Sequence, residues 1–111
     1  MRTKVGLWID HKKAVIVAIS DKGEEMSVII QRPHTGKLNI YYDAVIACIR
    51  DEESILIFGP DEANTELKKR LEINDLGERI VGVETVNNIT DRQIAAKVRQ
   101  HFLKKPWAIM A

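Results

Sequence analysis

The sequence has little of several features that define protein classes. Only one of its 111 residues is a cysteine, Cys48, which excludes an internal disulfide and a zinc site built from several cysteines. Aromatic residues make up 5%, and no apolar run approaches the roughly 20 residues of a membrane-spanning helix. Neither charge dominates, because 17 lysines and arginines stand against 16 aspartates and glutamates. A net charge of +1 argues against a highly basic nucleic-acid-binding domain, since such binding is mostly phosphate neutralisation.

What the sequence does contain is enough apolar material for one folded core. Hydrophobic residues make up 45% and charged residues 30%, which excludes a disordered, highly charged tail. A chain of this length buries roughly two-thirds of its unfolded surface on folding, so we expect a single domain over residues 1–111. The first residues lead directly into a strand-like pattern rather than a signal sequence, and we therefore expect a cytoplasmic protein.

The first third of the chain is expected to form three strands. Residues 4–10 alternate between two faces, which is the period of a strand. Residues 14–19 form a continuous run rich in β-branched residues, which is typical of a strand covered on both faces. Residues 26–31 have the composition of a third strand. The short polar connections between these runs indicate an antiparallel meander.

Helical periodicity begins after a loop that contains proline and glycine. Residues 38–50 are apolar over a wide arc, and we expect Cys48 to lie on the buried face of this first helix. A fourth strand is expected at residues 54–58. Pro60 then suits the first position of a second helix, which should end between Glu72 and Asp75.

The third helix has the clearest start signal, and it follows a fifth strand expected at residues 79–86. Thr90 and Gln93 form a capping box, in which each side chain accepts a hydrogen bond from the other residue's backbone N–H. Ile89 and Ile94 have the spacing of a hydrophobic staple. The resulting order, β-β-β-α-β-α-β-α, predicts an α/β fold with a five-stranded mixed sheet and helices packed on it, as in the ribonuclease H-like architecture.

Several segments, taken in order, resemble a known family. The stretch from Val5 to Val15 resembles the opening hairpin of the middle domain of archaeal and eukaryotic peptide-chain release factors. It is more similar to small bacterial translational-machinery proteins related to that domain. The strand at 54–58, the helix at 66–71 and the strand at 79–85 resemble later parts of the same domain. The resemblance covers nearly the whole chain and implies a shared fold and association with the ribosome or RNA.

The sequence departs from this family in one loop. In the release-factor middle domain, the loop between the third strand and the first helix carries Gly-Gly-Gln. Residues 31–37 of this chain read Gln-Arg-Pro-His-Thr-Gly-Lys, with a single glycine and no following glutamine. Peptide release is therefore not expected, and the prediction is a domain that is not an enzyme and needs no cofactor.

Contact with RNA would need exposed cations, and two loops supply them. The candidate contacts are Lys12, Lys13, Arg32, His34 and Lys37. No aromatic residues are interleaved with these cations to stack on bases. An alternative is a protein-interaction or homodimeric module with no nucleic-acid role, which would use a sheet edge or the apolar end of the chain.

A third alternative is a metal-dependent nuclease, because ribonuclease H-like nucleases hold metal ions with carboxylates. Asp10, Asp43 and Asp61 are the candidate ligands. A two-metal site needs several carboxylates to converge. Asp10 at a turn and Asp61 at a helix start already have simpler structural roles, so no metal site is expected.

The last residues are unusually apolar. Trp107, Ile109 and Met110 follow Pro106, which should end the third helix. An exposed apolar cluster of this kind tends to bind other surfaces. Burial of each large apolar side chain stabilises the folded or associated state by about 1.5–3 kcal/mol. We expect this tail to dock on the domain's own surface, with docking on a second copy as the alternative.

Overall fold

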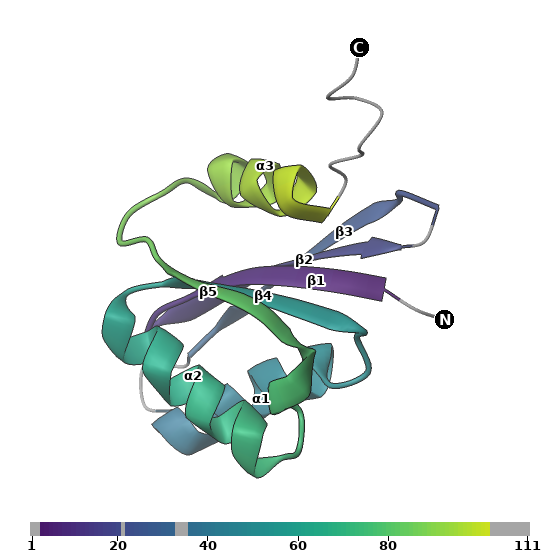
Figure 1. The fold of residues 1–111 in the computed structure, drawn as a ribbon. Coiled ribbons are helices and arrows are strands. Elements are labelled where there is room, and N and C mark those ends of the chain that lie inside the picture. The colour runs from purple at the N-terminus through teal and green to yellow at the C-terminus, as the bar shows by residue number, and fades with distance from the viewer. Residues whose placement is uncertain (1–2, 21, 33–35, 103–111) are drawn as a thin grey trace.

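The computed structural model describes residues 3–20, 22–32 and 36–102, which form one sheet flanked by helices (Figure 1). The strands are β1 (Thr3–Ile9), β2 (Lys13–Ser20), β3 (Glu25–Gln31), β4 (Ser54–Gly59) and β5 (Ile80–Thr85). The helices are α1 (Leu38–Ile49), α2 (Asp61–Ile73) and α3 (Asp91–Phe102), with a short 3-10 turn, η1 (Gly77–Arg79), before β5. His34 and the tail residues Trp107, Ile109 and Met110 lie outside the described residues.

The sheet has the strand order β3-β2-β1-β4-β5 and mixed directions. The pairs β1–β2 and β2–β3 are antiparallel, whereas β1–β4 and β4–β5 are parallel. The predicted meander followed by two β-α units is therefore confirmed, and the fold is ribonuclease H-like.

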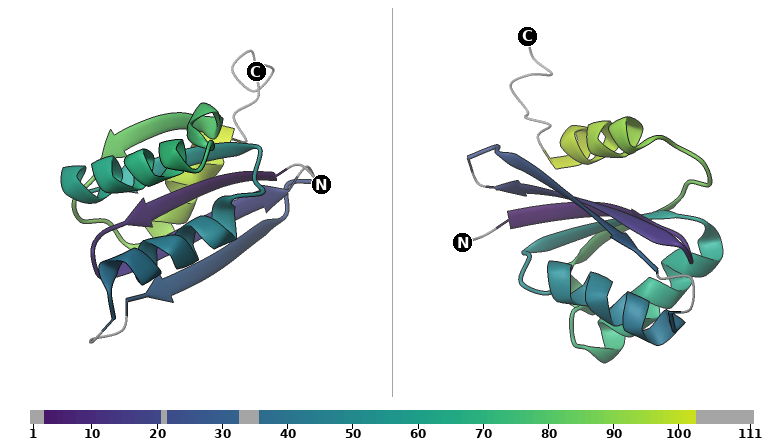
Figure 2. Two further views of the ribbon diagram at one scale, coloured as in Figure 1. Left: turned by 90° about the horizontal axis from the view of Figure 1, so that it is seen from below. Right: turned by 180° about the vertical axis from the view of Figure 1, so that it is seen from behind.

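Helices cover the two faces of the sheet unequally. α1 and α2 lie on one face and α3 lies alone on the other (Figures 1 and 2). Alternation along β1 sends Leu7 into the core beneath α1 and α2, and sends Trp8 into the core beneath α3. β2 is likewise buried on both faces, with Ile16 on the first side and Val17 on the second, which explains its continuous apolar sequence.

The buried face of α1 differs from the prediction. Cys48 is exposed, so its expected place on the buried face is wrong. The apolar residues of α1 cover too wide an arc for the sequence to show which side meets the sheet. The structure selects the side that carries the two tyrosines, and Tyr41 Oη donates to the backbone oxygen of Asp10 at 2.8 Å. The buried residues of α1 are Tyr41, Tyr42, Val45, Ile46 and Ile49.

A buried asparagine ties α2 to the ends of two strands. Pro60 occupies the N-cap, one residue before the predicted position, and α2 starts at Asp61. Asn64, on its first turn, is 1% exposed, and its Nδ2 donates to Gly59 O at 2.8 Å and to Glu84 O at 3.0 Å. One amide therefore joins α2 to the carboxyl ends of β4 and β5.

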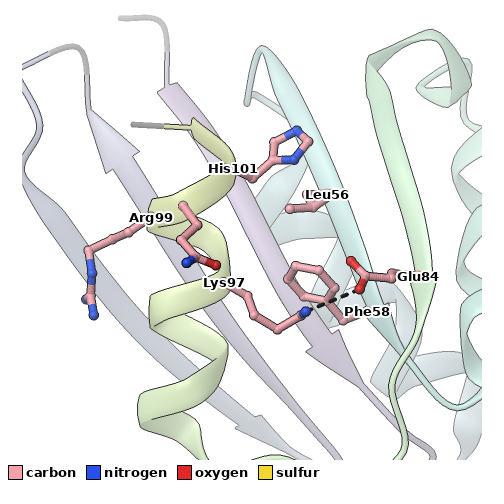
Figure 3. A pocket seen from close by; sticks show the side chains of 7 residues that line it. Leu56, Phe58, Glu84, Lys97, Arg99 and His101 are labelled. Carbon is pink, nitrogen blue, oxygen red and sulfur yellow. Dashed lines mark hydrogen bonds and ion pairs between the residues drawn. The ribbon is translucent and has the colours of Figure 1, made fainter. Parts of the chain in front are cut away.

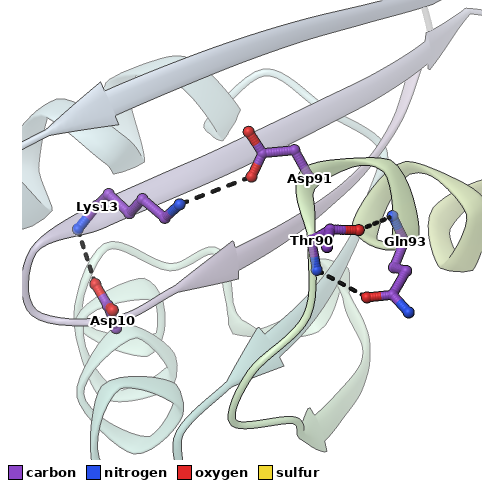
Figure 4. Close-up of polar contacts among 5 residues, drawn as sticks. All are labelled: Asp10, Lys13, Thr90, Asp91 and Gln93. Carbon is purple, nitrogen blue, oxygen red and sulfur yellow. Dashed lines mark hydrogen bonds and ion pairs between the residues drawn. The ribbon is translucent and has the colours of Figure 1, made fainter.

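The predicted start of α3 is confirmed. Thr90 N donates to Gln93 Oε1 at 2.8 Å, and Gln93 N donates to Thr90 Oγ1 at 3.1 Å (Figure 4). Ile94 is fully buried in the core beneath α3, and Ile89 packs against the same core. No helix in the described part of the chain is long and apolar enough to cross a membrane.

Candidate nucleic-acid interface at one end of the sheet

The turn between β1 and β2 is built around Asp10. Its Oδ1 accepts a hydrogen bond from the backbone N–H of Lys12 at 2.7 Å. It accepts another from the backbone N–H of Lys13 at 2.8 Å (Figure 4). Its own N–H donates to Lys13 O at 3.0 Å. The carboxylate therefore fixes the turn and holds the two lysines at its tip.

Arg32 brings the loop after β3 against this turn. Its backbone N–H donates to Lys12 O at 2.8 Å, and one guanidinium nitrogen lies 3.3 Å from His11 O. Its Nε donates to Gly36 O at 3.0 Å, and Lys37 is the next residue. Four of the five predicted RNA-contact residues, Lys12, Lys13, Arg32 and Lys37, therefore belong to two loops that meet at one end of the sheet, which we call the basic end.

The cations of the basic end differ in their exposure and in the contacts that they already make. Lys12 and Lys37 are exposed. Lys13 has a 3.7 Å ion pair with Asp91 (Figure 4). Its ammonium also lies 5.9 Å from the centre of the Trp8 ring. The Arg32 guanidinium already donates hydrogen bonds to backbone oxygens of Gly36 and His11. Lys12 and Lys37 are therefore the side chains best placed to contact a phosphate.

Beneath the basic end lies a partly buried polar layer. Burial raises the pKa of the Tyr41 hydroxyl above its ordinary value, and the nearby Asp10 carboxylate raises it further. Tyr41 is therefore a neutral donor that supports the turn. His11 Nε2 is buried and has no hydrogen-bond partner in the described structure. The layer positions the turn and leaves the exposed lysines as the groups that can reach a ligand.

The three aspartates suggested for a metal site have separate roles. Asp10 caps a turn, Asp43 lies on the exposed side of α1, and Asp61 is exposed at the start of α2. Across residues 3–20, 22–32 and 36–102, no group of three or more histidine, cysteine, aspartate or glutamate side chains could hold a metal ion. These residues therefore do not supply the carboxylate cluster of a two-metal nuclease.

A groove of about 830 Å³ lies between α3 and strands β4 and β5 (Figure 3). Leu56 and Phe58 form its floor, and the Lys97 ammonium pairs with Glu84 at 3.2 Å on its rim. Arg99, also on α3, pairs with Glu25 of β3 at 2.8 Å. These cations are already neutralised, so the groove offers an anion less than the basic end does. No sequence pattern predicted this groove, because its residues come from three separate elements, β4, β5 and α3.

Comparison with known proteins gives matches in structure alone. No protein-family model matches the chain, and no curated protein matches its sequence. The fold matches Pelota from Archaeoglobus fulgidus with a TM-score of 0.65 at 17% identity, over 93% of this chain and 32% of that one. It matches Pelota from Thermoplasma acidophilum with a TM-score of 0.66 at 13% identity, over 98% and 34%. An archaeal protein also matches, with a TM-score of 0.64 at 11% identity, over 97% and 36%.

These matches establish the fold. Pelota is an archaeal release-factor-like translation protein, so the fold expected from the resemblance to release-factor middle domains is confirmed. The chain spans about a third of the length of each solved structure that it matches. Nearly all of this chain therefore matches about one third of each of these longer solved structures.

Proposed function

We propose that this chain is a non-enzymatic, translation-associated domain that contacts ribosomal or other RNA through its basic end. Two observations support the class: the sequence resemblance to release-factor middle domains and the fold shared with Pelota. The location of the RNA-binding site rests on the hydrogen bonds from Arg32, which hold the loop after β3 against the Lys12–Lys13 turn. Two loops distant in sequence thereby present their cations on one surface.

The position of this surface also supports the proposal. The loop between β3 and α1 corresponds to the loop that carries Gly-Gly-Gln in release-factor middle domains. In this chain it carries cations in place of that motif. The same end of the fold would then meet RNA through phosphate contacts without performing peptide release.

Phosphate contacts make a quantitative prediction. Each one adds about 0.7 to the slope of log affinity against log salt concentration for a single-stranded nucleic acid. Lys12→Glu with Lys37→Glu should weaken co-sedimentation with ribosomes and lower this slope by about 1.4. Within the described part of the chain neither side chain makes a hydrogen bond or ion pair, so the fold should be retained.

A matched control separates local contact from overall charge. Lys68 and Lys69 are exposed on α2, away from the basic end, and Lys68→Glu with Lys69→Glu changes the net charge equally. The control should co-sediment like the unmodified protein. Equal loss in both variants, or co-sedimentation that is insensitive to salt, would contradict contact through the basic end.

A further inference from the structure

The two edges of the sheet are not equally protected, and β3 is the open one. It lies at one end of the strand order and pairs with β2 over all seven of its residues without a register shift. Three of its large apolar side chains are exposed: Met26 by 69%, Ile29 by 52% and Val28 by 43%. It carries no proline or lysine, the residues that commonly guard an edge strand.

The hydrogen-bonding pattern shows which backbone groups of β3 are free. Arg32 N donates to Lys12 O and Ser20 N donates to Glu24 O, so these residues form hydrogen-bonded pairs with β2. Such pairs alternate along an antiparallel ladder. The backbone N–H and C=O groups of Glu25, Ser27, Ile29 and Gln31 therefore point away from β2, toward the open edge.

The helix nearest this edge, α1, covers only part of it. α1 begins beside the basic end, where Tyr41 bonds to Asp10 O, and its far end is held by Arg79, which donates to Arg50 O beside the start of β5. α1 thus starts beside β3 and draws away from it toward its C-terminal end (Figure 2). Ile30 stays partly covered, whereas Met26 and Val28, on the same face, do not.

We infer that β3 pairs with β3 of a second copy, antiparallel and with the twofold axis at Val28. In this register Glu25 lies opposite Gln31 of the second copy and Ser27 lies opposite Ile29, so every outward backbone group has a partner. Four hydrogen-bonded residue pairs would supply about eight hydrogen bonds. The two five-stranded sheets become one continuous sheet.

The side chains favour the same register. On the face that α1 leaves open, Val28 meets Val28 of the second copy and Met26 meets Ile30, which buries the exposed apolar side chains against one another. Beyond the strand ends, Glu24 lies opposite Arg32 of the second copy, so opposite charges meet. A strand that fits itself over its full length and charge pattern favours a second copy over an unrelated peptide.

The experiment is sedimentation velocity of the full chain over a range of concentrations. The unmodified protein should shift toward dimer as concentration rises. Val28→Lys places two like charges opposite each other at the axis and should weaken association at least tenfold. Val83→Lys on β5 is the matched control, because Val83 is 44% exposed and Val28 is 43% exposed, and it should leave association unchanged.

Cross-linking tests the register in a Cys48→Ser background. Facing residues of a non-hydrogen-bonded pair have Cα atoms about 4.5 Å apart, which a disulfide can span. Val28→Cys should therefore form a disulfide-linked dimer under mild oxidation. Met26→Cys should not, because the two copies of residue 26 would lie about 14 Å apart along the strands.

Three results would overturn the inference. The first is a protein that remains monomeric at all concentrations. The second is a dimer that Val28→Lys leaves intact. The third is a dimer that deletion of residues 107–111 abolishes while Val28→Cys gives no cross-link, which would assign association to the tail. RNA contact is measured separately, so a monomeric Val28→Lys variant that still co-sediments with ribosomes keeps the proposed function.

Discussion

The two edges of the sheet differ in how well their backbone groups are protected from pairing with another strand. β5 is a short parallel strand with a register shift against β4, and its Glu84 is held through both its backbone oxygen and its carboxylate, by Asn64 and Lys97. β3 is a regular antiparallel strand whose outward backbone groups carry no such ties in the described structure. Both edges expose valine side chains to a similar extent, so exposure alone does not distinguish them.

This difference teaches that an edge is protected by its backbone partners more than by its side-chain composition. An irregular register and side chains bonded to the backbone leave an incoming strand no continuous row of partners. At β5 these ties come from α2 and α3, the helices that flank it in sequence. At β3 the Glu25 carboxylate pairs with Arg99 of α3, but among the described residues no side chain bonds to the outward backbone groups of the strand.

The largest expected effect is at Gly59, where β4 ends beside β5. Gly59 has a φ of 141°, and a Cβ there would collide with the backbone oxygen of Ile9. Gly59→Ala should lower the free energy of unfolding by about 3 kcal/mol in urea denaturation. Gly23, in the β2–β3 turn, has a φ of 83° but open space around it, so Gly23→Ala should cost only about 1 kcal/mol. Equal costs would mean that the β4 end is no more constrained than the turn.

The next effect is at Asn64, the residue that ties the β5 edge. Asn64→Ala removes hydrogen bonds to Gly59 O and Glu84 O at a buried position. Loss of both should cost about 2 kcal/mol of unfolding free energy. It should also speed hydrogen exchange of amides in β5 more than in β3, and uniform acceleration across the sheet would argue against a local tie.

A smaller effect is expected at the start of α3, which packs against β1 and β2. Thr90→Ala removes one half of the capping box and should cost about 1 kcal/mol. Thr90→Ser keeps the hydroxyl and should be close to neutral. An unchanged urea midpoint in the alanine variant would contradict the role of this cap.

The smallest stability effect should come from the open edge itself. Met26→Thr changes a side chain that is 69% exposed, so the free energy of unfolding of the dilute monomer should move by no more than about 0.5 kcal/mol. The same substitution should weaken self-association, because Met26 meets Ile30 of the second copy in the inferred dimer. A large loss of monomer stability would show that β3 is held by contacts within the chain.

Tyr41 and Tyr42 provide a pH-dependent comparison of neighbouring hydroxyls. Burial, followed by the Glu66 charge, raises the pKa of Tyr42 to about 12, and its hydroxyl has no hydrogen-bond partner among the described residues. The unfolded chain ionises near pH 10, so unfolding free energy should fall as pH rises from 10 toward 12, by up to about 1.4 kcal/mol per pH unit for each tyrosine. Tyr42→Phe should reduce this slope at little cost near pH 7, whereas Tyr41→Phe should also lose about 1 kcal/mol through its bond to Asp10. An unchanged slope in both variants would contradict tyrosine ionisation as its cause.

The local order of the chain was largely determined by its sequence. Alternation in β1, the continuous run of β2 and the capping box at Thr90 depend on neighbouring residues, and each element formed where its pattern predicted. The cations of the basic end were likewise identifiable, because their loops were polar and punctuated by proline and glycine.

Tertiary structure alone decided which surfaces these elements share. The buried side of α1, the reach of Asn64 to two strands and the meeting of Arg32 with the β1–β2 turn all join residues distant in the chain. The openness of β3 depends on the direction that α1 takes across the sheet. No local pattern encodes these outcomes, because each follows from how helices pack against a sheet whose strand order is not the order of the sequence.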